Sequence, residues 1–246
     1  MSLATIEPST AAAKDSDSWA GPLLILWIVL TAAIQASFWV TGWRSRALAG
    51  AVEQGAAVIE ARKFGEEPDA AIRRSLRSQR ETLPFWTVMA LMGDLVGEPA
   101  SLALRALAVT TEFAALAALG GRSPRFGDTL AACAAAQGLW VPGSATRLGL
   151  ALVTGNAEVD SSLAVALPPG TYRAPVWVAL RQADAFAMAG WGVLAWCGWR
   201  HARLGLAAAV LTCAPLWAAE AAGRIAGTLM VESGMRLQLI PEWIAR

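Results

Sequence analysis

Several charged residues of this 246-residue chain stand inside long apolar stretches, where a charge is costly to bury. A charged side chain at the centre of a bilayer costs about 2.5–3.5 kcal/mol on insertion scales, so such residues normally face protein or water. They either line a polar pathway or form ion pairs. The candidate intramembrane residues are Arg105, Glu112, Arg147, Arg181, Asp184, Glu220 and Arg224.

The spacing of these charges favours particular pairings. Glu220 and Arg224 are four positions apart, which is the spacing of a direct pair on one helix. Arg105 and Glu112 are seven apart, two turns along one helical face. We expect these charges to form interhelical ion pairs; the alternative is a pathway for an ion or small solute.

Depth divides the same residues into two groups. Arg181, Asp184 and Arg224 lie close enough to the ends of apolar stretches to extend their charges toward water. The deep candidates are Arg105, Glu112, Arg147 and Glu220.

Residues for covalent or metal chemistry are scarce. His201 is the single histidine, so sites with several histidines and most His-based catalytic triads are excluded. Cys133, Cys197 and Cys213 are far apart in sequence and lack metal-ligand spacing, which favours packing roles. The sequence therefore predicts a non-enzymatic protein without a metal site.

Composition indicates a membrane protein. Hydrophobic residues make up 56% and charged residues 16%, against about 25% charged in soluble domains. The mean hydropathy is +0.46. The net charge of +1 argues against a nucleic-acid partner. We predict an all-α, polytopic transmembrane helical bundle of about five spans.

The chain divides into five segments. The first apolar stretch predicts a transmembrane helix, because it is long enough to cross a bilayer and Pro22 stands in its first turn. Tryptophans flank this span as interfacial anchors. The predicted segments are a polar tail (1–19), the first transmembrane helix (20–43), a charged segment (44–98), a four-helix transmembrane bundle (99–231) and a C-terminal tail (232–246).

Segment 44–98 is rich in charge over residues 44–82, with helical spacing of its apolar residues and a break near Pro68. It predicts a helical hairpin outside the bilayer, acting as a solvated connector or as a docking surface. The following stretch, 83–97, is too short to span and contains Asp94, so we expect it to be interfacial or re-entrant.

Within the predicted bundle, a span ends at Gly120-Gly121, and the next contains Pro142 as a kink. Two short basic turns, 122–125 and 200–203, are two spans apart and so share a side, which the positive-inside rule places in the cytoplasm. The eight basic residues of segment 43–98 oppose this orientation.

Small residues fill the last span. Gly223 and Gly227 form a small-xxx-small repeat, which predicts close helix packing within the bundle or against a partner. The twelve tryptophans are read as interfacial anchors, with pigment or quinone stacking as an alternative. No cofactor is identified.

Residues 99–222 resemble the Yip family of Ypt/Rab-GTPase-interacting membrane proteins, which includes bacterial members. The likeness rests on the Gly120-Gly121 ending with its basic turn, on Asp184-Ala-Phe186 with Trp191 and Gly198, and on the turn 200–203. Trp191 lies farther from Asp184 than the family pattern leads us to expect. The resemblance implies a five-span bundle without catalytic residues and, in eukaryotic members, a trafficking adaptor.

We therefore expect a scaffold or accessory subunit that contacts membrane lipids and packs against other integral membrane subunits of a larger complex. The alternative is a small-solute or ion transporter or channel that uses the buried charges. The Ala- and Arg-rich composition favours a bacterial cytoplasmic membrane.

Overall fold

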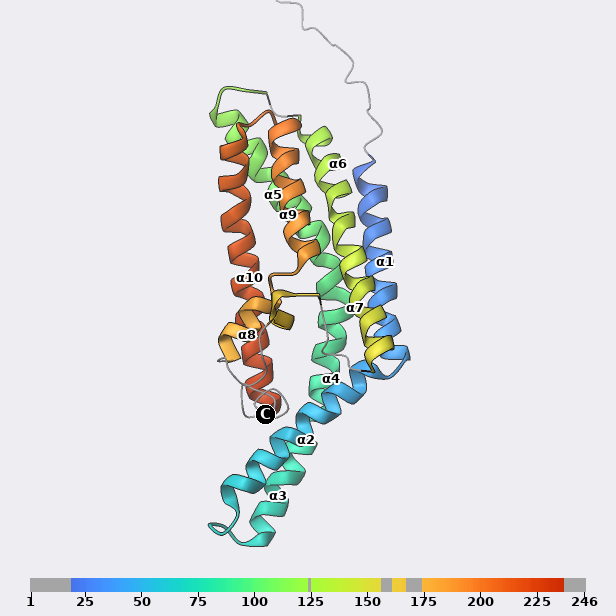
Figure 1. Ribbon diagram of the computed structural model, residues 1–246, viewed down its shortest axis with the longest axis vertical. Coiled ribbons are helices and arrows are strands. Elements are labelled where there is room, and N and C mark those ends of the chain that lie inside the picture. The colour runs from blue at the N-terminus through green and yellow to red at the C-terminus, as the bar shows by residue number, and fades with distance from the viewer. Residues whose placement is uncertain (1–18, 124, 156–160, 167–173, 237–246) are drawn as a thin grey trace, which may run out of the picture.

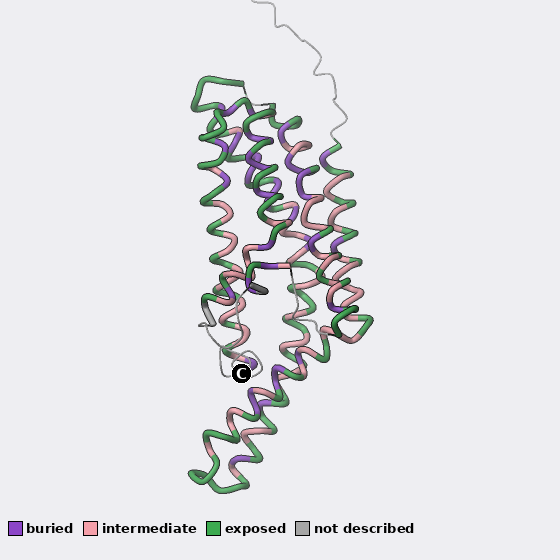
Figure 2. Tube along the Cα trace, in the orientation of Figure 1, coloured by how far each residue is buried: buried purple, intermediate pink, exposed green. Residues whose placement is uncertain are grey.

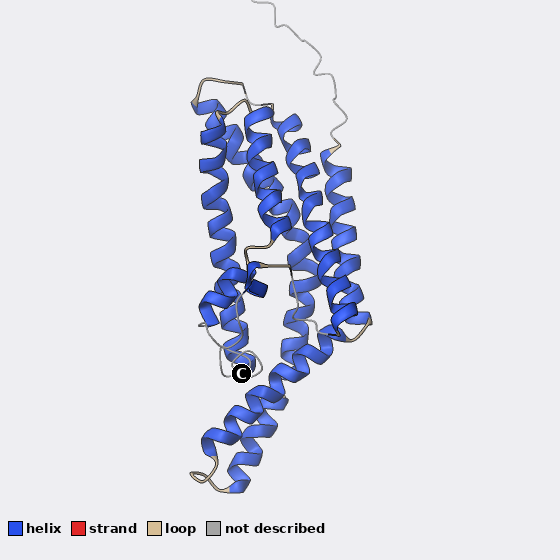
Figure 3. Ribbon diagram, viewed as in Figure 1, coloured by secondary structure: helices blue, strands red, loops and turns tan. Residues whose placement is uncertain are grey.

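The computed structural model describes residues 19–123, 125–155, 161–166 and 174–236. Over these ranges the chain is helical, and extended pairing is limited to an isolated bridge between Ser162 and Asp184 (Figure 3). The all-α prediction is therefore confirmed. The predicted polar tail, apart from its last residue, and most of the C-terminal tail lie outside the described residues.

The described helices of the bundle form five columns, and consecutive columns run in opposite directions (Figure 1). The basic turns therefore meet at one end, where the Arg122 guanidinium donates a hydrogen bond to the Arg203 carbonyl. The columns are α1 (Ala20–Val40); α4 (Leu83–Met92) with the π-turn η1 (Gly93–Gly97) and α5 (Glu98–Leu119); α6 (Phe126–Ala136) with η2 (Gln137–Leu139) and α7 (Trp140–Thr154); α9 (Ala185–Arg200); and α10 (Leu206–Arg236).

Three helices are long and apolar enough to cross a membrane: Ala20–Val40, the run Asp69–Leu119 and Leu206–Arg236. Much of α1 and α10 is exposed or half-buried (Figure 2). The exposed residues include large apolar ones, such as Ile25 at 63% exposure and Leu211 at 73%. Apolar side chains that face outward on long helices are what a bilayer requires. Column α9 is shorter, at 16 residues, and η2 divides the α6–α7 column.

The charged segment forms a helical hairpin that extends beyond one end of the bundle (Figure 1). Its base packs against the end of α10, where the Gln79 side chain donates a hydrogen bond to the Met235 carbonyl at 2.8 Å. Helices α2 (Trp43–Lys63) and α3 (Asp69–Arg80) are joined at residues 64–68, and they pack against each other. Glu53 binds the Arg80 guanidinium at 2.9 Å, and this hydrogen bond raises the pKa of Arg80. Because the pair is exposed, it contributes little to stability.

Residues 83–97 differ from the predicted interfacial or re-entrant stretch, because their helix runs on into α5 without turning back. Pro99 has no N–H to donate to the preceding turn of the helix. The wider π-turn η1 lies at that turn and accommodates the missing hydrogen bond. Asp94 is held by Trp39 and by Arg44, whose Nε lies 2.7 Å from its carboxylate. The run Asp69–Leu119 has 51 residues and is about 75 Å long, much longer than a bilayer core of about 30 Å.

Prolines and glycines set the breaks of the other columns. Pro142 cannot donate to the carbonyl of Gly138, and the chain tightens into η2 at that point. Gly121 has φ +69°, a conformation that favours glycine, where α5 ends and the chain turns. Helix α10 continues through Pro215 to Arg236, beyond the predicted boundary at 231.

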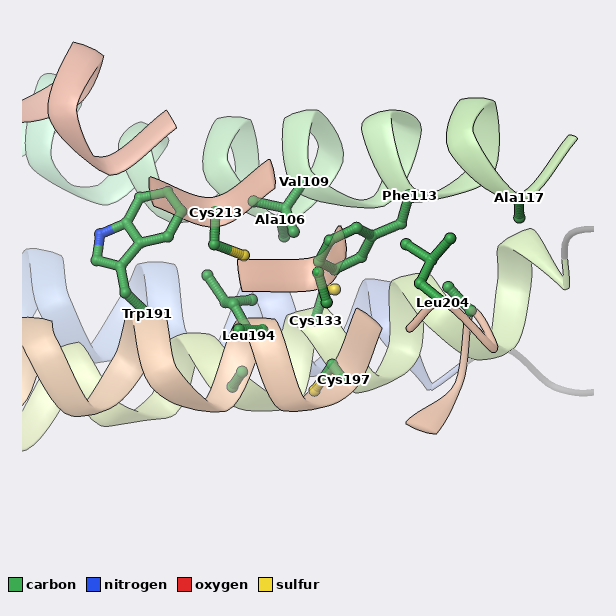
Figure 4. Packing of buried hydrophobic residues seen from close by; sticks show 14 residues of the cluster. Ala106, Val109, Phe113, Ala117, Cys133, Trp191, Leu194, Cys197, Leu204 and Cys213 are labelled. Carbon is green, nitrogen blue, oxygen red and sulfur yellow. The ribbon is translucent and has the colours of Figure 1, made fainter. Parts of the chain in front are cut away.

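The apolar core lies between α5, α6, α9 and α10, and the Phe113 ring extends from α5 toward Cys133 (Figure 4). A methyl group added at Gly198 would lie 2.5 Å from this ring. The glycine therefore lets α9 approach α5 closely. All three cysteines are buried and free, as expected for packing residues.

Candidate functional site: an ion-paired cavity in the bundle

A chain of alternating charges crosses from α5 to α10. Arg105 donates to both carboxylate oxygens of Glu220, with Nε–Oε2 at 2.8 Å and Nη2–Oε1 at 2.5 Å. Arg224 donates to Glu220 at 3.1 Å and to both oxygens of Glu98, at 2.7 and 3.1 Å. Two arginines and two glutamates therefore neutralise one another along this chain.

The Arg105 guanidinium is enclosed on its remaining sides. Its Nη1 donates to the side-chain oxygen of Gln137 at 2.8 Å, and Gln137 is fully buried. The Trp140 ring lies 4.2 Å from the guanidinium carbon, and the Trp191 ring lies 5.9 Å from it. Aromatic faces attract a cation, and the attraction is stronger where water is excluded. Gly190 permits this arrangement, because a Cβ there would lie 2.4 Å from Trp140.

A second polar cluster surrounds Asp184 at the start of α9. The carboxylate accepts hydrogen bonds from the backbone N–H of Phe186 at 2.7 Å and of Ala187 at 3.3 Å, which makes it the N-cap. Ser161 and Arg147 bind the other oxygen, at 2.7 and 3.2 Å. Asp184 is 2% exposed, so the prediction that it extends into water is wrong: helix capping holds it inside the protein.

A cavity of about 70 Å³ lies between the two clusters. Its walls come from α1, α5, α7, α9, α10 and α8 (Ala174–Arg181). The wall residues include charged groups from both clusters and aromatic rings: Thr31, Glu98, Trp140, Ser144, Arg147, Arg181, Asp184, Phe186, Trp191, Trp217, Glu220 and Arg224.

Six of the seven candidate charges line this cavity or, in the case of Arg105, pair with a residue that does; Glu112 is the exception. The expected Glu220–Arg224 pair is present, and Arg105 and Arg147 each pair with an acid from another helix. Glu112 is exposed and has no ion-pair partner among the described residues. Glu112 and Arg105 are two helical turns apart, about 10.5 Å along the axis, which is too far for a direct ion pair.

Gly223 and Gly227 have open space around them, with no atom within 4 Å of an added Cβ. Their predicted role in packing within the bundle is therefore absent from the described structure. Close helix contacts occur instead at Gly138 against Trp27 and at Gly143 against Phe186. The packing of Gly223 and Gly227 against a partner stays a prediction.

Glu98, Gln137 and Thr31 belong to this site but were not predicted from the sequence. Glu98 stands at the edge of an apolar stretch, and Gln137 and Thr31 are uncharged, so none suggested a buried network. The one available signal was Gln137 beside the mid-span Pro142.

The charges of the site pair with one another. Over the described ranges, no three His, Cys, Asp or Glu side chains are placed to hold a metal ion. Comparison with protein-family models, with curated proteins and with solved structures finds no match. The fold and site thus define a helical protein with membrane-length apolar helices, and the resemblance to the Yip family stays a prediction.

Proposed function

We propose that all five columns cross the membrane, with the hairpin outside the bilayer. The alternation of column direction supports this topology. Helix α9 is about 24 Å long over its 16 residues, shorter than a typical hydrocarbon core of about 30 Å, so its crossing requires the bilayer to thin locally. The hairpin is too charged to enter lipid.

We further propose that the protein is a non-enzymatic scaffold or accessory subunit of a larger complex, in the cytoplasmic membrane of a bacterium. One observation carries this proposal: Glu112 lies exposed on a membrane-length helix without an ion-pair partner among the described residues. A lone carboxylate facing lipid is costly, so a neighbouring membrane subunit supplies the missing donor. The Yip-like motifs add support for an adaptor role.

The surface around Glu112 suits a partner helix. Leu116 and Leu104 flank it on α5 at 36% and 66% exposure, so the carboxylate stands among apolar side chains. Such a setting favours a transmembrane helix with a basic or hydrogen-bond-donating side chain at the same depth.

Photocross-linking in native membranes tests this role. A photoreactive residue at Leu116 should form an adduct with another membrane protein chain, and Glu112→Gln should lower its yield while leaving the melting temperature (Tm) unchanged. The matched control is a probe at Leu26, which is 46% exposed on α1. Lipid adducts alone at Leu116, or a yield unaffected by Glu112→Gln, would contradict the scaffold proposal.

A second candidate function is passage of an ion or small solute, favoured by the charged cavity within the bundle. It predicts that Glu220→Gln abolishes proton flux into proteoliposomes, measured with an entrapped pH-sensitive dye. Glu112→Gln should leave that flux intact, because Glu112 lies away from the cavity. Equal flux in Glu220→Gln and the wild type would exclude proton passage through this site.

A further inference from the structure

Each carboxylate around the cavity is already paired with a guanidinium group. Glu220 accepts three hydrogen bonds from Arg105 and Arg224, and Glu98 accepts two from Arg224. Asp184 accepts four, from Arg147, Ser161 and two backbone N–H groups. The acids that face this cavity are therefore poor sites for an added cation.

Hydrogen-bond donors, in contrast, remain available. The Arg147 guanidinium has five N–H groups and uses one nitrogen, Nη2, to bind Asp184. The Thr31 hydroxyl is buried, with 4% of the residue exposed, and has no hydrogen-bond partner. A buried hydroxyl without a partner costs about 1–3 kcal/mol. Both groups line the same cavity, and so does the Ser144 hydroxyl.

Size limits the ligand. A water molecule needs about 10–15 Å³ of such space, so a cavity of about 70 Å³ holds about five groups of that size. A phosphate group, with one phosphorus and four oxygens, is of this size. The guanidinium fork matches phosphate oxygens in geometry as well as charge.

We propose that this cavity is a binding site for a phosphate group, held by Arg147 through free N–H donors and by the Thr31 hydroxyl. The group belongs either to a small soluble phosphate or to the headgroup of an anionic phospholipid. The site requires no partner subunit, so the phosphate-binding proposal can be tested independently of the scaffold proposal.

Two measurements on the full-length protein in detergent test the proposal. The first follows the Tm of delipidated protein as inorganic phosphate is added, with chloride at matched ionic strength as the reference. The second uses native mass spectrometry to detect phosphatidylglycerol retained after exposure to mixed phosphatidylcholine–phosphatidylglycerol micelles. A saturable rise in Tm indicates a soluble ligand, whereas selective retention of phosphatidylglycerol indicates the lipid headgroup.

The variants locate the site. Arg147→Gln should abolish the response, while Arg125→Gln, the same change at an exposed turn, should leave it unchanged. Thr31→Val removes the hydroxyl with little change in shape and should weaken affinity about fivefold, the loss of one hydrogen bond. Because Thr31→Val also removes an unpaired buried hydroxyl, it should fold even if Arg147→Gln does not. The proposal is overturned if neither ligand is detected, or if Thr31→Val binds as well as the wild type.

Discussion

Arg105 and Glu220, 115 positions apart in the chain, are joined by two hydrogen bonds between their charged groups. The Arg105 side chain is 3% exposed and that of Glu220 is 27% exposed. The pair connects α5 to α10, and its Glu220 lines the cavity. Arg224 and Glu98 extend it, so the two helices are connected by charges at two levels.

Removing one member of this pair should destabilise the bundle. Arg105→Gln leaves Glu220 with Arg224 as its remaining cation, and we expect a loss of about 1.5–3 kcal/mol, because Glu220 loses its hydrogen bonds to the Arg105 guanidinium. Thermal unfolding in detergent measures it. Arg105→Leu combined with Glu220→Leu should cost less than the sum of the single changes. A double variant with strictly additive losses would show that the pair is not energetically coupled.

Two helical glycines should respond oppositely to alanine. Gly190→Ala places a methyl group against Trp140, and we expect a loss of about 1–3 kcal/mol from overpacking. Gly223→Ala meets open space and should stabilise its helix by up to about 1 kcal/mol. The Tm of each purified variant checks this contrast. Equal shifts for both would mean that Trp140 moves aside freely.

Two changes at Asp184 separate its roles. Asp184→Asn retains a side-chain oxygen for the N-cap of α9 but removes the charge paired with Arg147. Asp184→Ala removes both, and it should be less stable than Asp184→Asn by about 0.5–2 kcal/mol, the contribution of a cap. Denaturation of both variants in the same detergent gives the difference. If they unfold alike, the ion pair and not the cap is the main contribution.

Cysteine labelling in membrane vesicles tests the five-span topology. Ser78 lies in the hairpin and Ser123 in a basic turn at the opposite end of the bundle, and both are exposed. A membrane-impermeant thiol reagent should label Ser78→Cys and Ser123→Cys from opposite sides of the membrane. The three native cysteines are buried and provide an unreactive background. Labelling of both positions from one side would refute an odd number of spans between the hairpin and the turn.

Local chemistry explains which features could be predicted from the sequence. The helical nature of each column follows from its residues, the breaks at Gly121 and near Pro142 follow from their backbone limits, and the Glu220–Arg224 pair follows from helical spacing. These features depend on residues within a few positions of one another. The five-span count was predicted from the same local patterns. It includes α9 and the divided α6–α7 column, whose lengths do not by themselves establish that they cross the membrane.

Contacts between distant helices decided the remaining features. The sequence named Arg105, Arg147 and Asp184 as candidates, but their partners depend on how α5, α7, α9 and α10 pack side by side. Spacing placed Arg105 and Glu112 on one face, yet the neighbours that bury one leave the other exposed. The unpaired hydroxyl of Thr31 could be found only in the tertiary structure, because hydrogen-bond satisfaction depends on which helices surround a side chain. The sequence by itself determined which residues carry charge into the apolar columns, and the packing of those columns decided which charges meet.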